Sequence, residues 1–223
     1  MTRRTLTKSR FKLAQECPTK LSYTGKKSYG NTKNDDPFLK ALAEGGFQVG
    51  ALAKLYCPGG VEIETLDYDK AIQETTNLLA KPEAVIFEAA LSFGNLFVRV
   101  DVLQKVGDKV FLYEVKAKSY DPETDRFFQK KGKEKKFIAE WEPYLYDIAF
   151  QAYVAQKALP KLKVSSHLYL VNKFVEATVD GLNQNFLLKR SPTGRPTVEV
   201  QKALTGDPSP SFGAIETPGL CLS

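Results

Sequence analysis

Three consecutive segments in the middle of the chain concentrate hydrophobic residues in the manner of β-strands. They read AVIFEAAL (84–91), LFVRVDVLQ (96–104) and KVFLYEVKA (109–117), and each is rich in Val, Leu and Phe. The dipeptides Gly94-Asn95 and Gly107-Asp108 separate the segments, and both suit the two-residue loop of a β-hairpin. The pattern therefore predicts an antiparallel meander of three strands.

Helical patterns precede and follow this meander. Apolar spacing, N-cap residues and terminating prolines predict four helices, which cover residues 5–17, residues 37 to 57 ahead of Pro58-Gly59-Gly60, residues 67–81, and residues 144–159. Residues 164–171, VSSHLYLV, have the composition of a buried strand. A strand–helix–strand order implies a crossover that lays this strand parallel within the sheet. These elements together predict an α/β protein.

Acidic residues recur at equal steps of thirteen along the meander, at Glu88, Asp101 and Glu114. If both dipeptides form two-residue loops, Glu88 lies opposite Asp101 and Asp101 lies opposite Glu114. Like charges so placed destabilise a sheet unless a cation offsets their repulsion. By strand alternation Lys116 shares the face of Glu114. Three residues of the same strand are expected to face a core on the other side, namely Phe111, Tyr113 and Val115. The pattern leaves two interpretations, a divalent metal site or a solvated outer face of a half-buried sheet.

Composition and charge narrow the class of protein. The chain has 223 residues, 43% of them hydrophobic, which suits one large domain over residues 1–204 followed by a Pro- and Gly-rich tail over residues 205–223. The chain has 32 Lys and Arg residues and 26 Asp and Glu residues, and several of the acids cluster in the meander. The rest of the chain is therefore more basic than the total indicates, which favours a polyanionic partner. A long apolar run and a signal sequence are missing, and three scattered cysteines do not suggest disulfides. We expect a cytoplasmic protein without a membrane partner.

An insert over residues 118–143 mixes basic and aromatic residues. Its basic positions, which are candidates for nucleic-acid contacts, are Arg126, Lys130, Lys131, Lys133, Lys135 and Lys136. They interleave with Phe127, Phe128 and Phe137. Cations on phosphates and rings under bases are typical of single-strand binding. The alternative is a solvated excursion whose phenylalanines anchor it to the core.

The order of these motifs resembles the PD-(D/E)XK nuclease superfamily. More narrowly it is similar to the RecB-like branch that includes the CRISPR-associated adaptation exonucleases and an uncharacterised bacterial group with the same amino-terminal module. The segments that carry the resemblance are LAQECPTKL (13–21), FQVGALAKLYCPGG (47–60), IFEAAL (86–91), VRVDVL (98–103), YEVKAKS (113–119), YLYDIAFQAYV (144–154) and LVNK (170–173). The motif Asp-x(12)-Glu-x-Lys is weak alone, but these flanking segments make the match more specific.

The resemblance implies a restriction-endonuclease-like fold of three layers, α/β/α, whose mixed sheet contains the antiparallel meander. It implies hydrolysis of DNA with Mg²⁺ or Mn²⁺, at ends or in single strands. Asp101, Glu114 and the backbone carbonyl of Val115 would be metal ligands, with Glu88 as a further ligand. Lys116 would orient the attacking water and stabilise the negative charge that develops on the phosphate oxygens. The roles implied for Gln151 and Tyr153 are to position the substrate backbone.

The chain departs from this branch in two ways. Relatives often carry a ligand histidine on the upstream helix, whereas GGFQVG stands there, and the only histidine, His167, is expected to be a core residue. Gln48 or Glu44 stands near the missing ligand. Cys17 matches the first of four cluster cysteines, but only Cys221 follows near the end, so a [4Fe–4S] cluster is expected only in a longer native chain. Other functions also fit, namely RNA-directed or structure-specific cleavage and nucleic-acid binding without catalysis.

Overall fold

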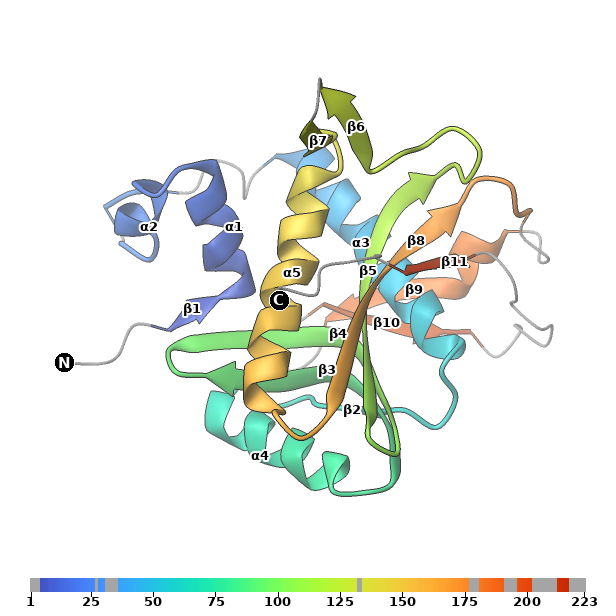
Figure 1. The fold of residues 1–223 in the computed structure, drawn as a ribbon. Helices are drawn as coiled ribbons and strands as arrows, with labels where there is room; N and C mark the ends of the chain where they lie inside the picture. Colours follow the sequence, from blue (N-terminus) through green and yellow to red (C-terminus); the bar gives the residue numbers. More distant parts are fainter. Residues whose placement is uncertain are drawn as a thin grey trace.

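A computed structural model of the protein describes residues 5–26, 28–30, 36–131, 134–176, 181–190, 196–201 and 212–216, without the side chains of Lys131 and of 212–216. The strands of its main sheet are β1 (Leu6–Thr7), β2 (Val61–Glu62), β3 (Glu83–Phe93), β4 (Leu96–Val106), β5 (Lys109–Tyr120), β8 (Lys163–Asn172) and β11 (Phe212–Glu216). They lie in the order β11-β8-β5-β4-β3-β2, and β1 pairs with β4 off this path. Parallel and antiparallel pairs mix in this sheet, and helices flank it in a three-layer α/β/α arrangement (Figure 1). The predicted fold class is confirmed.

The meander has the register that its loops predict. β3 pairs antiparallel with β4, for example Leu91 with Val98, and β4 pairs antiparallel with β5, for example Leu103 with Leu112. Gly94 and Gly107 have positive φ angles of 61° and 60°, which glycine adopts without steric cost. The two-residue loops therefore fix which side chains of the three strands share a face.

The helices begin at the capping residues that the sequence offers. Their bounds are α1 (Lys8–Glu16), α2 (Lys20–Tyr23), α3 (Pro37–Leu55), α4 (Tyr68–Leu79) and α5 (Glu142–Ala158). Thr7, Asp36 and Asp67 each accept a hydrogen bond from a backbone N–H of the first turn, in α1, α3 and α4 respectively. The predicted helices are confirmed.

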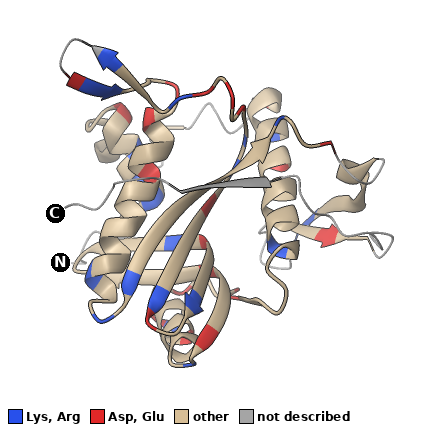
Figure 2. Ribbon diagram, turned by 45° about the vertical axis from the view of Figure 1, so that its right-hand side comes forward, with Lys and Arg blue, Asp and Glu red and all other residues tan. Residues whose placement is uncertain are grey.

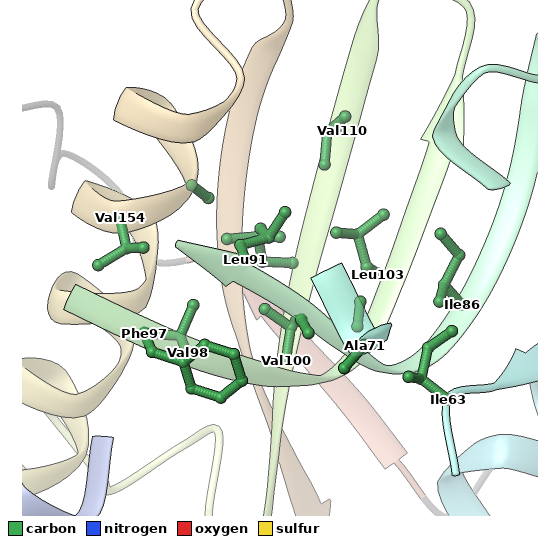
Figure 3. Packing of buried hydrophobic residues seen from close by; sticks show 14 of the residues in the cluster. Ile63, Ala71, Ile86, Leu91, Phe97, Val98, Val100, Leu103, Val110 and Val154 are labelled. Carbon is green, nitrogen blue, oxygen red and sulfur yellow. The ribbon is translucent and has the colours of Figure 1, made fainter. Parts of the chain in front are cut away.

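The sheet is covered on both faces. α5 reaches Glu114 on one face of β5, whereas Tyr56 at the end of α3 contacts Tyr169, which belongs to the opposite face. The main core joins sheet residues such as Leu103 and Val110 to Ala71 of α4 and Val154 of α5 (Figure 3). Fully burying an aliphatic side chain of this kind contributes about 1.5–3 kcal/mol. The packing fixes α5 over the meander.

The second half of the chain completes the sheet and adds two hairpins. β8 is parallel to β5, as predicted. β6 (Phe128–Lys131) pairs with β7 (Glu134–Phe137), and β9 (Phe186–Arg190), which follows the short 3-10 helix η2 (Leu182–Asn185), pairs with β10 (Pro196–Val200).

The end of the chain departs from the expectation of a loose tail over residues 205–223. Within that range, β11 pairs antiparallel with β8. The physical reason is that β8 would otherwise be an edge strand with unpaired backbone groups, which β11 satisfies. Of the described helices, none is both long and apolar enough to cross a bilayer.

Candidate active site

A fork between β4 and β5 creates the candidate site. The two strands pair from Val106 and Lys109 as far as Val102 and Tyr113, and beyond that point β5 continues along β8. Asp101 lies at the opening of the fork, where its Oδ2 accepts a hydrogen bond of 2.8 Å from the backbone N–H of Val115. The Asp101 carboxylate therefore spans the gap between the diverging strands, next to Glu114.

Glu114 is the centre of the cluster. Its side chain is only 1% exposed, and both carboxylate oxygens accept hydrogen bonds from Lys8 Nζ, at 3.1 and 3.0 Å. Gln151 Nε2 donates at 2.7 Å, and Lys116 Nζ donates as well. Such a buried, fully bonded carboxylate is not a solvated surface acid, so the interpretation as a solvated outer face is wrong for Glu114. The structure brings Asp101, Glu114, Lys116 and Gln151 together as the sequence predicted.

The main core also lies on this side of the meander. On β5 the fully buried residues are Val110, Leu112 and Glu114, whereas Phe111, Tyr113 and Val115 are only half-buried on the other face. The acidic face of β5 is therefore the more deeply buried one, contrary to the expectation, because α5 covers it more completely than α3 covers the opposite face.

Two members of the cluster were not predicted as site residues. Asp147 of α5 is 1% exposed and pairs with Lys116 Nζ at 2.8 Å. Lys8, the first residue of α1, lies 3.6 Å from Asp101 Oδ1 and 3.0 Å from Glu114 Oε2. Asp147 precedes Gln151 by one helical turn, and two polar residues so placed on an otherwise buried helix were the available signal. No local pattern pointed to Lys8.

The ionisation of the cluster follows from burial opposed by ion pairs. Burial alone would raise the pKa of Glu114, but the charges of Lys8 and Lys116 and the hydrogen bonds outweigh it and hold that pKa well below its usual range. Burial and then the charge of Glu114 raise the pKa of Asp101 and of Asp147. Glu114 therefore keeps its charge to a lower pH than the other two carboxylates, which repel it.

The donor set fits a hard divalent cation. Asp101 Oδ1 and both oxygens of Glu114 face one point, which Lys8 Nζ occupies. Asp147 Oδ1 and Gln151 Oε1 are buried, and neither has a hydrogen-bond partner in the described part of the chain. Carboxylate and amide oxygens are the ligands that Mg²⁺ prefers. Over the same described residues, no three His, Cys, Asp or Glu side chains are grouped closely enough to hold a metal ion by themselves.

The backbone of β3 is distorted at Glu88. The β3–β4 ladder skips the pair of Glu88 and Asp101, although the register is the same on both sides. Glu88 has a φ of 55°, the one positive φ at a non-glycine residue in the described part of the chain. Such a conformation costs about 1–3 kcal/mol and is found preferentially at functional sites. By the register of β3 and β4, the half-buried Glu88 is level with Asp101, without a ladder pair between them. The third carboxylate of the cluster, after Asp101 and Glu114, is that of Asp147.

Of two further predicted positions, Tyr153 lies outside the cluster, whereas Val115 contacts it through its backbone N–H. Tyr153 follows Gln151 by two residues, which turns it to another side of α5, and it packs half-buried against the main core. Val115 pairs with Tyr169 in the β5–β8 ladder, and its backbone N–H donates a hydrogen bond to Asp101. His167 is buried on the opposite face of the sheet, stacked on Tyr113 with ring centroids 5.1 Å apart, so the expectation of a core histidine is confirmed.

The basic insert forms the hairpin β6–β7, which extends from the body of the protein and carries lysines (Figures 1 and 2). The exposed basic residues are Lys130, Lys135, Lys136 and Arg126, of which Arg126 donates to two backbone carbonyls of its own loop and Lys136 pairs with Glu134. Lys135 Nζ lies 4.1 Å from the Phe128 ring centroid. Lys131 is described in its backbone alone, and Lys133 lies outside the described residues.

Phe127 holds the base of the insert in place. Its ring lies 5.0 Å from that of Trp141, beside the second core cluster formed by α5 and β8. The anchoring interpretation thus describes Phe127 and also Phe137, which packs against the same cluster and lies 6.1 Å from the Tyr146 ring of α5. Phe128 contacts Phe137 on the hairpin, with ring centroids 4.9 Å apart.

The cysteines do not form a common group in the described structure. Cys17, which caps the end of α1, and Cys57, which follows α3, are half-buried free thiols. Backbone hydrogen bonds from Thr19 lower the pKa of the Cys17 thiol. Cys221, the other residue considered for a cluster, lies outside the described residues.

Comparison with known proteins gives no relative. A scan of protein-family models, a search of curated proteins and a search of solved structures each return no match. The function is therefore inferred from the side chains around Glu114 and from the motifs of the sequence.

Proposed function

We propose that the protein is a metal-dependent nuclease of the PD-(D/E)XK type, which hydrolyses phosphodiester bonds of DNA at ends or in single strands. One observation carries this proposal: Asp101 and Glu114, from strands that diverge, face a single cationic point, with Lys116 beside it. Binding alone requires no such buried set of like charges, which is costly to maintain.

The residues of the chain divide the work of hydrolysis. Bound Mg²⁺ or Mn²⁺ would supply Lewis acidity and a water of lowered pKa. Asp101 and Glu114 would hold that ion, with Glu88 and the carbonyl of Val115 as further candidates. Glu114 and Asp147 hold the Lys116 ammonium beside the same point, where it can donate to phosphate oxygens as their charge grows.

Orientation of the central carboxylate depends on Gln151. Its amide N–H donates to Glu114 Oε2 from a fully buried position on α5. A donor fixed by packing holds a ligand carboxylate in one orientation, as outer-shell partners of metal ligands do. We infer that Gln151 is a positioning residue.

The hairpin β6–β7 suits the proposed substrate. Lys130, Lys135 and Lys136 are exposed, which allows contact with phosphates, and the partly exposed ring of Phe128 is one on which a base can stack. The net charge of +6 favours a polyanion in the same way. DNA is therefore the proposed partner, bound as a single strand or at a duplex end.

A second candidate function is nucleic-acid binding without catalysis. The observation that favours it is the ion pairing of Lys8 with Asp101 and Glu114, which neutralises part of the acidic cluster without a metal. In that case the lysine would be a permanent replacement for the metal.

Cleavage of end-labelled single-stranded DNA tests the proposed function. We expect shortened products with Mg²⁺ or Mn²⁺, no products after chelation with EDTA, and no products from Asp101→Asn. Parallel reactions with blunt duplex DNA and with RNA assign the substrate. Binding without cleavage under every metal condition would favour the second candidate, and equal cleavage by Asp101→Asn would identify a contaminating nuclease.

A further inference from the structure

The amino-terminal segment delivers one lysine to the acidic cluster. β1 pairs in parallel with the start of β4, Leu6 with Leu96 and Thr7 with Phe97, on the edge of β4 that β5 leaves free. α1 begins immediately afterwards at Lys8, capped by the side chain of Thr7. The position of Lys8 next to the fork is therefore set by strand pairing rather than by chance contact of a long side chain.

Lys8 occupies the point where the acids converge. Its Nζ lies within 3.1 Å of both Glu114 oxygens and 3.6 Å from Asp101 Oδ1. Lys116 instead bridges Glu114 and Asp147, on the other side of the cluster. The two ammonium groups thus have different carboxylate partners apart from Glu114, and Lys8 is the one that contacts both Asp101 and Glu114 among the described ion pairs.

The charges of the cluster favour exchange of Lys8 for a divalent ion. When Asp101, Glu114 and Asp147 are all ionised, the three carboxylates and the two ammonium groups together have a net charge of minus one. A divalent cation added to this set makes it positive, whereas one that replaces Lys8 makes it neutral. A buried site favours the neutral combination, since uncompensated charge in a low-dielectric environment is costly.

We propose that Lys8 is a placeholder cation, whose ammonium and a divalent metal ion compete for the same oxygens of Asp101 and Glu114. This inference rests on the proposed function, because it assigns the metal to that site. A change of side-chain rotamer is sufficient for the exchange, since Lys8 has a flexible stem and its side chain is 24% exposed. α1 itself stays in place, because Phe11 stacks on Phe150 of α5 at 4.5 Å.

Mn²⁺ binding by calorimetry tests the competition without an activity assay. We expect Lys8→Met to bind Mn²⁺ about tenfold more tightly than the wild type, a factor typical of coupled sites. Lys12→Met is the matched control on the exposed side of α1, and it should bind like the wild type. Equal or weaker binding by Lys8→Met would overturn the inference and leave the proposed function intact. Absence of binding in every variant would overturn both, and binding by Lys8→Met alone supports the inference.

Amine labelling of the wild-type protein gives a second measurement that does not depend on a variant. In this structure Lys8 Nζ is bonded to carboxylates, so an acylating reagent should modify it slowly when no metal is added. Saturating Mg²⁺ should raise the modification of Lys8 severalfold and leave that of Lys12 unchanged, as measured by peptide mass spectrometry. Unchanged or slower labelling of Lys8 on metal binding would overturn the inference.

Discussion

Lys116→Met reduces the rate of DNA cleavage by about 10²–10³ or more, in our expectation, with little effect on DNA binding. The fall is this large because a fixed charge at the reacting phosphate acts on the transition state in a site screened from water. Lys116 meets this condition, since Glu114 and Asp147 hold its ammonium and its side chain is only 18% exposed. Single-turnover cleavage at saturating protein measures the chemical step, and filter binding measures affinity.

Lys118→Met is the matched control for this variant. Lys118 lies two residues further along β5, where its ammonium pairs with Glu140 and lies 4.5 Å from the Trp141 ring centroid. Lys118 has no described contact with Asp101, Glu114 or Asp147. Its replacement should therefore change the cleavage rate by less than about twofold, within the small effects of surface substitutions. A similar fall in both variants would show that Lys116 has no specific part in the reaction.

Glu114→Ala has the second large effect, on stability. We expect the free energy of unfolding to fall by about 3 kcal/mol, the loss typical when one partner of a buried ion pair is removed. Glu114 is the shared partner of Lys8, Lys116 and Gln151, and its lowered pKa means that the folded state favours its charged form. This contribution is present above the unfolded pKa and is lost as the pH falls through the lower folded pKa. Urea unfolding at pH 7 measures the change.

Asp147→Asn serves as the comparison, because the sign of its effect is opposite. Burial and the charge of Glu114 raise the pKa of Asp147, so its ionised form destabilises the folded state, and this cost disappears as the pH falls through its folded pKa. Asp147→Asn should therefore raise Tm rather than lower it, because it removes that charge and keeps a side chain of the same shape beside Lys116. Destabilisation by Asp147→Asn equal to that of Glu114→Ala would contradict this division of roles.

The main elements were predictable because local patterns determine them. Two dipeptides with glycine set the register of the meander, and this register places Asp101 and Glu114 at the same level. Capping residues such as Asp36 and Asp67 mark the starts of helices in the same local way. Side-chain alternation then puts Lys116 on the face of Glu114.

The remaining features depend on contacts distant in sequence. Lys8 joins the site through the pairing of β1 with β4, and neither partner of that short ladder carries a pattern that predicts it. Asp147 was visible as a polar position, but only the packing of α5 shows that it contacts Lys116. The fork itself arises because β5 continues with β8 after it leaves β4, which is a property of the whole sheet. The placement of β11 on β8 is non-local in the same sense.

An anomalous difference map from crystals soaked in Mn²⁺ is the most direct test of the central claim, that Asp101 and Glu114 hold a common metal ion. We expect a peak bonded to a carboxylate oxygen of each residue, at about 2.0–2.6 Å as for other hard cations. Lys8 Nζ should have moved away from both acids. Mn²⁺ bound elsewhere, or Lys8 still bonded to Glu114 at saturating Mn²⁺, would contradict the account.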